Sequence, residues 1–252
     1  AMRAVEENLE LYHLVARDAE RVKVTNAGLL LFARDVGRWH PLAGIRFARV
    51  DGKERRHGKD RNVSQLSRLD APLARLIADA QAFCAHHIRK SERLHDLFFR
   101  EYPEYPAFAW QEAIVNAVAH RDYSVQGLET EVWLYDDRLE VMSPGVLLPP
   151  VTIQALRSRK SVHVSRNPLL VRVLVEAGIM REEGEGIPRM IEELEESFLR
   201  PPSFLEEHGI FKVTLFNTPI LESGSPEWQG IVDRLSISTN QKRVLVGCPD
   251  GF

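Results

Sequence analysis

The sequence predicts an α+β fold in which helices are layered on one mostly antiparallel sheet. Residues 128–135 alternate between apolar and polar side chains, and the Asp136-Asp137 turn leads into a second strand over 138–143, as in a hairpin. A third strand is expected over 210–216. Apolar residues at helical spacing predict the helices that pack against these strands, at 107–121, 167–177 and 186–198.

The remaining elements follow from shorter patterns. In chain order, they are a helix over 3–17, a helix over 26–32, a strand over 45–50, a long helix over 64–90 and a helix over 151–157. Thr25 is expected to cap the second of these helices, and Asp51-Gly52 marks a turn after the strand. From residue 217 the chain is rich in Ser, Pro and Thr, which indicates a linker, with a short helical piece near 226–235.

Composition excludes several classes of protein. The chain has 252 residues, with 33 Lys and Arg against 36 Asp and Glu, and the resulting net charge of -3 does not favour a basic, nucleic-acid-coated surface. Hydrophobic residues make up 44%, which argues against disorder, and no apolar run is long enough for a transmembrane helix. Cys84 and Cys248 cannot form a disulfide framework, so we expect a cytoplasmic protein without a membrane partner.

The helix predicted over 107–121 carries a polar stripe. Glu112, Asn116 and His120 recur every four residues, so they lie along one line of an otherwise apolar helix. Because buried polar groups need partners, one interpretation is a hydrogen-bonded structural stripe. The other interpretation is the wall of a site, since a carboxylate can orient water and an amide oxygen beside a carboxylate suits Mg²⁺.

Three further segments have alternative interpretations. Gly184-Glu-Gly186 precedes a predicted helix, where bare N–H groups and the helix dipole favour anions, although the same residues suit a simple turn. Residues 157–167 contain four cations and three serines, which either cover phosphates or form solvated surface. The basic residues 53–61 form either a solvated loop or a nucleic-acid contact.

Several catalytic signatures are absent from the sequence. Residues 52–59 come nearest to a Walker loop, but the spacing is wrong and Lys59 is followed by Asp60 instead of Ser or Thr. No DExH-type box appears, so a helicase motor is not predicted, and there is no Gly-x-Ser-x-Gly elbow. Cys84 lies close to two histidines but lacks the second ligand pair that a zinc site needs.

Five segments, in order, carry a resemblance to a known family. Residues 112–124 resemble an EALVNALVHRDYS segment. The other matches are the segment that precedes the domain (25–32), a DDRIEIxNPG hairpin (136–145), an RNP segment (165–168) and a GxIExxGxGI run (178–187). Over about residues 9–217, the chain thus resembles the RecG-related, Schlafen-associated bacterial proteins, which are predicted transcriptional regulators. The resemblance implies a divergent GHKL-type ATPase domain, an α/β sandwich with an N-terminal α/β subdomain.

The resemblance also implies roles for individual residues. Glu112 would be the water-activating base, Asn116 the Mg²⁺ ligand, and Gly184 and Gly186 would lie by the phosphates of ATP or another nucleotide. The matched motifs supply further cofactor-binding candidates, namely His120, Arg121, Asp122, Gly145, Arg166 and Asn167. The chain departs from the GHKL pattern at Ser143, which stands where those enzymes have an Asp that contacts the adenine amino group.

The same resemblance implies an organisation in three parts. Residues 1–100 would form the N-terminal α/β subdomain, 101–217 the divergent GHKL-like ATP-binding domain, and 218–252 a linker and the start of a winged helix. In this family a Schlafen/AlbA-like DNA-binding domain usually lies upstream and a winged helix downstream. We therefore expect a piece of a longer protein, with most DNA contacts in modules that this chain lacks.

Three functions are consistent with these patterns. The first is a regulatory nucleotide-binding module of a DNA-binding transcriptional regulator, in which the ligand binds between the 107–121 helix and the Gly184 turn. The second is a Mg²⁺-dependent ATPase with Glu112 as its base. The third is a non-catalytic scaffold, whose polar stripe is structural and which serves as a homodimer interface or domain spacer.

Overall fold

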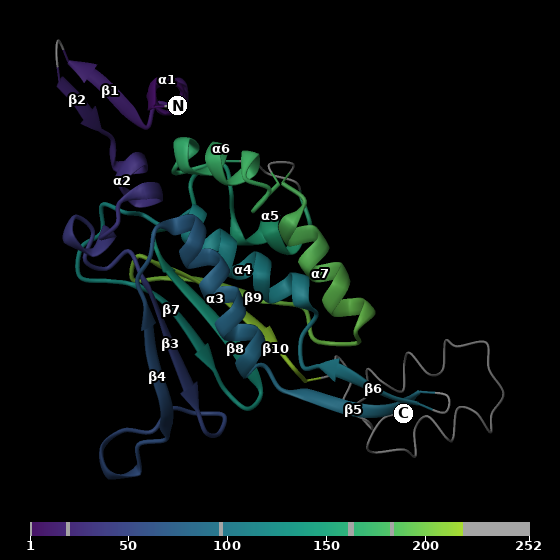
Figure 1. Ribbon diagram of the computed structural model, residues 1–252. Coiled ribbons are helices and arrows are strands. Elements are labelled where there is room, and N and C mark those ends of the chain that lie inside the picture. The colour runs from purple at the N-terminus through teal and green to yellow at the C-terminus, as the bar shows by residue number, and fades with distance from the viewer. Residues whose placement is uncertain (1, 19–20, 96–97, 161–163, 182–183, 219–252) are drawn as a thin grey trace, which may run out of the picture.

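The computed structural model describes residues 2–18, 21–95, 98–160, 164–181 and 184–218 (Figure 1). Its main sheet has six strands, in the order β4 (Val63–Leu69), β3 (Ile45–Val50), β7 (Thr130–Leu134), β8 (Arg138–Pro144), β10 (Ile210–Phe216) and β9 (Ser203–Glu207). β3 and β7 are parallel, and the other neighbouring pairs are antiparallel. The predicted α+β fold with a mostly antiparallel sheet is therefore confirmed.

Helices cover one face of this sheet (Figure 1). They are α1 (Met2–Leu11), α2 (Asn26–Phe32), α3 (Leu73–His87), α4 (Ala107–Ala119), α5 (Ile153–Arg157), α6 (Pro168–Glu176) and α7 (Gly186–Glu196), with short 3-10 turns η1 (Val36–Arg38) and η2 (Gly58–Asp60). Two separate hairpins project from the body, β1 (Val15–Asp18) with β2 (Arg21–Val24), and β5 (Lys90–His95) with β6 (Phe98–Pro103).

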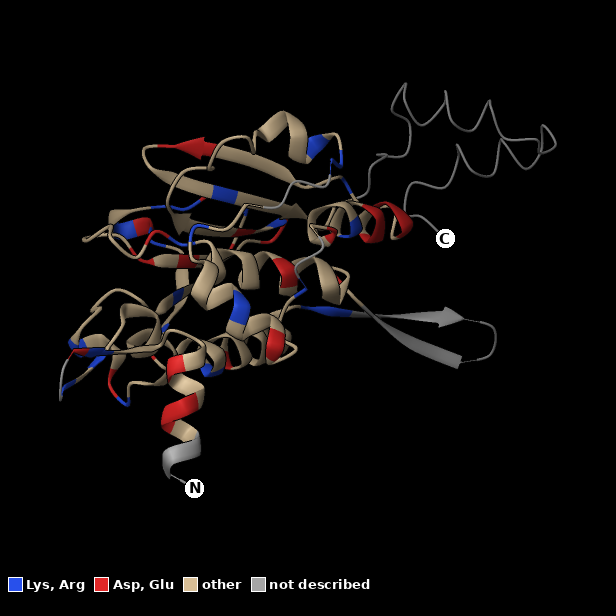
Figure 2. Ribbon diagram, turned by 90° about the horizontal axis from the view of Figure 1, so that it is seen from above, with Lys and Arg blue, Asp and Glu red and all other residues tan. Residues whose placement is uncertain are grey.

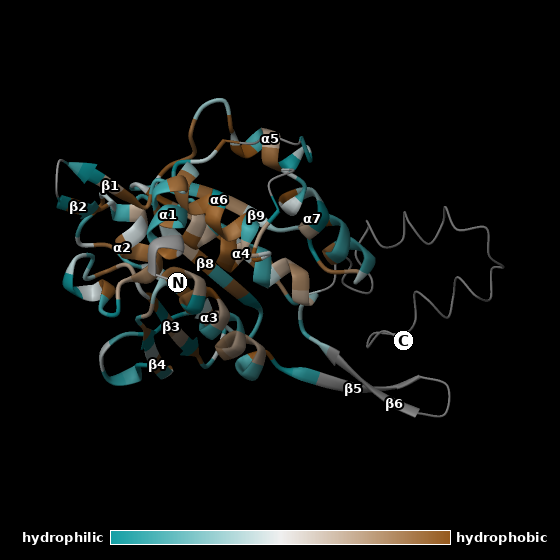
Figure 3. Cartoon of the chain, turned by 45° about the horizontal axis from the view of Figure 1, so that its top comes forward, coloured by the Kyte–Doolittle hydropathy of each residue, from teal (hydrophilic) through white to brown (hydrophobic). Residues whose placement is uncertain are grey.

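The core forms around α4. This helix is apolar nearly all round, as expected for a helix enclosed by other elements, and it contacts α3, α7 and strand β8 (Figure 3). Ile114 and Val118 are at most 1% exposed, as are Phe47 and Leu139 on the facing strands. Burial of each such side chain contributes about 1.5–3 kcal/mol, so α4 is fixed in place by packing.

The opposite face of the sheet has a small apolar cluster of its own. Side chains alternate along β7, so Val132 joins the main core while Trp133 points to the other face. Trp133 and Tyr135 pack there against Ala48 and Val50. Guanidinium groups cover the aromatic rings, with Arg55 4.5 Å from the ring centre of Trp133.

Several predicted elements are confirmed and one is wrong. The helix over 26–32 is present with Thr25 as its cap, and the strands over 45–50 and 210–216 have the predicted bounds. The long helix over 64–90 is instead the edge strand β4 followed by α3. The helix expected over 3–17 ends at Leu11, and the hairpins and β9 were not predicted.

The error over 64–90 has a local cause. Exposed and half-buried residues alternate along β4, which is the period of a strand, and Leu66 is 54% exposed on the face away from the helices. Asp70, Ala71 and Pro72 separate this strand from α3. The sequence prediction counted Leu66 and Leu69 in a helical stripe. It therefore merged β4 and α3, which Pro72 separates.

None of the described helices is long and apolar enough to cross a membrane. The predicted helical piece near 226–235 and the winged-helix start fall outside the described residues. The division of the chain at residue 100 stays a prediction. Strands β3 and β4, which come before that position, lie in the same sheet as β7, which comes after it.

Candidate functional site

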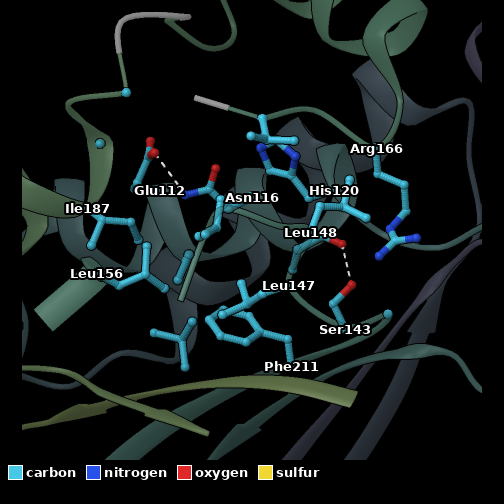
Figure 4. Close-up of a pocket in the computed structure, with 18 of the residues that line it drawn as sticks. Glu112, Asn116, His120, Ser143, Leu147, Leu148, Leu156, Arg166, Ile187 and Phe211 are labelled. Atoms are coloured by element: carbon cyan, nitrogen blue, oxygen red, sulfur yellow. Dashed lines mark hydrogen bonds between the residues drawn. The ribbon is translucent and has the colours of Figure 1, made fainter. Parts of the chain in front are cut away.

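A deep cavity opens between α4, the start of α7 and the strands β8 and β10 (Figure 4). The space inside it that water-sized molecules can occupy is about 180 Å³. Seven of the sequence-predicted site residues line it, namely Glu112, Asn116, His120, Gly145, Arg166, Gly184 and Gly186. The polar stripe of α4 thus forms a wall of a cavity.

Glu112 and Asn116 form a pair one helical turn apart on this wall. Asn116 Nδ2 donates a hydrogen bond of 2.9 Å to Glu112 Oε1 (Figure 4), which leaves the amide oxygen of Asn116 available to a ligand. Burial raises the pKa of the Glu112 carboxyl, and the bond from Asn116 and the charge of Arg189 only partly offset that effect. The site therefore holds a carboxylate in a partly dehydrated environment.

The start of α7 lies directly against this carboxylate. A Cβ atom placed on Gly186 would overlap the Glu112 carboxyl group, so only glycine permits the approach. Gly184 has a φ of +67°, in the left-handed region that favours glycine. Glu185 at the N-cap makes no side-chain capping bond and Pro188 has no N–H, so the N–H groups of Gly186 and Ile187 are the ones without that partner. Such a helix start attracts anions.

The other end of the cavity is apolar. Ser143 and Phe211 are cross-strand partners of β8 and β10, so both side chains rise from the same face of the sheet. Val141, Leu147, Leu148 and Val213 add to the apolar lining, and apolar side chains such as Leu156 and Ile187 also line the cavity beside Glu112 (Figure 4). Ser143 is 8% exposed, and its hydroxyl donates a 2.6 Å hydrogen bond to the carbonyl oxygen of Ala117. The cavity therefore suits a ligand that is anionic at one end and apolar at the other.

Arg166 and Gly145 form part of the rim. Arg166 Nη1 lies 3.2 Å from Asp122 Oδ2, and its Nη2 donates a 2.7 Å bond to the carbonyl of Val146. The side-chain hydroxyl of Ser124 and the charge of Arg166 help to lower the pKa of Asp122. Gly145 has a φ of +126° and would, with a Cβ atom, crowd Asp122. This network fixes the turn after β8.

Three predicted site residues lie away from the cavity wall. Arg121 is 3% exposed, and its guanidinium donates to the carbonyls of Asp122 and Leu128. Asn167 Nδ2 donates to the carbonyls of Ala119 (3.0 Å) and Arg121 (2.8 Å), which ties α6 to the end of α4. Asp122 and Asn167 border a second cavity, of about 460 Å³, that shares Arg166 with the first.

Sequence reasoning missed most of the apolar lining. The run of Val146, Leu147 and Leu148 directly after the Gly145 turn was a usable signal, as was the alternation that turns Phe211 inward. Two cations also line the cavity: Lys160, which belongs to the 157–167 segment already singled out, and Arg181, which the sequence reasoning left out.

No ready-made metal cluster is present among the described residues. No group of three His, Cys, Asp or Glu side chains there could hold an ion. Glu112 and Asn116 supply two oxygen-bearing groups, which matches the way Mg²⁺ is bound by few protein ligands together with phosphates and water. Burial raises the pKa of the Cys84 thiol to about 12, so this residue is an inert part of the core.

Comparisons with known proteins agree with an ATPase-type domain. Residues 127–215 match the family model HATPase_c_4, described as "Putative ATP-dependent DNA helicase recG C-terminal". The match begins after α4, so it includes Gly145, Arg166, Gly184 and Gly186 but neither Glu112 nor Asn116. No curated protein matches the chain.

Several chains of solved structures match this chain, and one shares the fold over most of its length. The DIP2311 protein from Corynebacterium diphtheriae superposes with a TM-score of 0.66 at 23% sequence identity, over 86% of this chain and 42% of that one. The present chain therefore spans less than half the length of this structural relative.

Proposed function

We propose that the cavity binds ATP, or another nucleotide, together with Mg²⁺, and that the chain is the regulatory nucleotide-binding module of a DNA-binding transcriptional regulator. One observation carries the nucleotide proposal, which is the Glu112–Asn116 pair facing Gly186 at the polar end of a cavity with an apolar far end. The match of residues 127–215 to an ATPase-type family model supports it.

The two ends of the cavity define how the nucleotide lies. Its phosphates face the N-terminus of α7, where helix dipole and bare N–H groups stabilise negative charge. Lys160 and Arg181 at the mouth add positive charge for the same groups. The amide oxygen of Asn116 would hold Mg²⁺, and the ion would supply positive charge that offsets the charge of the phosphates.

The base then occupies the apolar end beside Phe211 and Ser143. The single hydroxyl proton of Ser143 is committed to the carbonyl of Ala117, so Ser143 Oγ presents only acceptor lone pairs to the cavity. An acceptor matches the exocyclic amino group of adenine, whereas the corresponding carbonyl oxygen of guanine is also an acceptor. Ser143 therefore favours adenine without the carboxylate that GHKL enzymes use.

A second candidate function, ATP hydrolysis, is favoured by the burial of Glu112. A carboxylate with a raised pKa is a better general base for a water molecule than a solvated one. Phosphate release that Glu112→Gln abolishes, with nucleotide binding retained, would support hydrolysis. Binding without phosphate release would leave the regulatory module as the function.

Thermal-shift titration with Mg-ATP, Mg-ADP and Mg-GTP tests nucleotide binding. We expect stabilisation of the wild type by about 3 kcal/mol when the ligand is at about 100 times its Kd. Asn116→Ala should lose this response, and Asn8→Ala, a change at an exposed asparagine of α1, should keep it. No shift with any nucleotide would overturn the proposal and leave the scaffold function.

The regulatory role has to be tested in a longer protein that contains this chain. The proposal predicts that Mg-ATP changes the DNA affinity of a regulator that contains this chain and its DNA-binding modules. Asn116→Ala in that protein should remove the effect of the nucleotide on DNA affinity. An unchanged DNA affinity in the presence of bound nucleotide would contradict the regulatory role alone.

A further inference from the structure

The loop between β3 and β4 concentrates positive charge. Residues 53–61, here called the basic loop, contain five Lys or Arg residues against Glu54 and Asp60, a net charge of +3 in a chain of net charge -3. Elsewhere on the described ribbon basic and acidic residues are mixed, except that acidic residues gather at the end of α7 (Figure 2). All residues of the basic loop are exposed. The loop is therefore a positive patch on an otherwise negative chain.

The cations of the basic loop differ from those of the sheet beside it. Arg49 and Arg89 both pair with Asp136, and Arg138 pairs with Glu140. Within the described part of the chain, by contrast, no carboxylate pairs with the basic side chains of the loop, Lys53, Arg55, Arg56, Lys59 and Arg61. No carboxylate there neutralises their charge, and apart from Arg55, which stacks on Trp133, these cations are available to a partner.

Besides the contact of Arg55 with Trp133, hydrogen bonds of Asn62 hold the backbone of the basic loop in place. Asn62 Nδ2 donates to the carbonyl oxygens of Asp51 (2.7 Å) and Glu54 (2.9 Å), and Asn62 Oδ1 accepts the N–H of Arg56 at 2.8 Å. Asn62 therefore closes the loop from inside. A preorganised loop loses less conformational entropy when a partner binds.

The composition of the basic loop restricts the class of partner. Residues 53–61 contain no apolar side chain, so they offer no anchor of the kind that dominates protein–protein interfaces and none for insertion into a lipid layer. Charge–charge contact with a polyanion is the interaction that remains. The loop projects beyond the end of the sheet (Figure 1). A projecting loop can contact a groove or a single strand of a polyanion more readily than a flat protein surface can.

We propose that the basic loop binds the phosphate backbone of duplex DNA without reading its sequence. This inference goes beyond the nucleotide proposal, because the loop lies between β3 and β4 and none of its residues lines the cavity. It also adds a contact within this chain to those expected from DNA-binding modules elsewhere. Phosphate contacts of this kind position a protein on DNA, whereas base contacts supply specificity.

Fluorescence anisotropy with a labelled duplex of about 20 base pairs tests the proposal, because phosphate contacts make affinity depend on salt with a slope of about -0.9 per contact. With three to four contacts, log K should fall with log salt with a slope of about -3. The triple variant Arg56→Ser, Lys59→Ser, Arg61→Ser should flatten the slope to about -1 and weaken binding at least about tenfold at low salt.

A matched control removes the same charge elsewhere. Arg17→Ser, Arg21→Ser and Lys23→Ser change three exposed cations of the β1–β2 hairpin, and they should leave DNA binding within about twofold of wild type. Melting curves check that both variants fold. Absence of DNA binding at low salt, equal loss in the two variants, or equally tight binding to phosphatidylserine vesicles or polyglutamate would overturn the proposal.

Discussion

Glu112 illustrates how the site depends on single residues. Its carboxyl group is held between Asn116, which donates to it, and Gly186, where any side chain would overlap it. Burial makes ionisation of this carboxyl costly. A neutral side chain at this position would therefore make the fold more stable. Retention of strained or desolvated polar groups is typical of functional sites.

The raised pKa of Glu112 predicts a pH-dependent effect of Glu112→Gln. A carboxyl whose folded-state pKa lies above its ordinary value stabilises the fold while protonated, and that stability is lost as pH rises through the raised pKa. Glutamine stays neutral and can still accept from Asn116. The variant should therefore melt above wild type at pH 8, and the gap should close below the ordinary value of 4.5.

Melting curves of both proteins between pH 4 and pH 8, a range that brackets the titration of a raised carboxyl, measure the gap. Glu192→Gln on the exposed side of α7 is the control, and its melting temperature should follow that of wild type throughout. A variant that melts below wild type at pH 8 would show that the Glu112 carboxylate is stabilising, contrary to the account.

The hydrogen-bonding state of Ser143 predicts which nucleobase the cavity prefers. The wild type should bind Mg-ATP more tightly than Mg-GTP, and Ser143→Ala should weaken Mg-ATP binding about fivefold while leaving Mg-GTP within about twofold, since one neutral hydrogen bond contributes about 1 kcal/mol. Ser158→Ala is the control, because that hydroxyl also donates to a backbone carbonyl but lies on the surface. An ATP-to-GTP ratio that Ser143→Ala leaves unchanged would refute this role.

At the scale of elements, the end of α4 is joined to the start of α6. Helix ends leave carbonyl groups without intrahelical partners, and Asn167 satisfies the carbonyls of Ala119 and Arg121 from outside the helix. Arg121 in turn is bonded to the carbonyls of the following turn. Motif residues that looked like ligand contacts in the sequence therefore fix the helix that carries Glu112.

Asn167→Ala should destabilise the fold by about 2 kcal/mol, because two carbonyl groups lose their donor and each net hydrogen bond contributes about 1 kcal/mol. Urea denaturation measures the loss. Asn8→Ala on the surface of α1 should stay within about 0.5 kcal/mol of wild type. A loss below that margin for Asn167→Ala would mean that these two bonds do not hold the elements together.

Elements were predictable from sequence where one local pattern dominated. The Thr25 cap and the alternation over 210–216 gave correct bounds, since capping and the two-residue period are local properties. β9 was missed because three of its five residues are exposed, which weakens the apolar signal, and β4 was missed because Leu66 and Leu69 also fit a helical stripe. Their pairing depends on strands distant in the sequence.

At the scale of the whole molecule, the cavity combines segments that no local pattern connects. The stripe of Glu112 and Asn116 and the turn at Gly184 could be found from sequence, because polar residues and glycines stand out in apolar or helical surroundings. The lining by Phe211 could not, since it depends on the register of β10 against β8. The sheet brings the 112, 143, 186 and 211 positions around one space.

Isothermal titration of Mg-ATP into wild type, Asn116→Ala, Gly186→Ala and Gly37→Ala tests the central claim most directly. We expect one nucleotide per wild-type chain. Asn116→Ala, which removes the Mg²⁺ ligand, and Gly186→Ala, which displaces Glu112, should each bind at least about tenfold more weakly. Gly37→Ala should bind like wild type, because a Cβ there meets nothing closer than 3.5 Å. Absence of binding by wild type, or equal binding by folded Asn116→Ala and Gly186→Ala, would contradict the claim that this cavity is a nucleotide site.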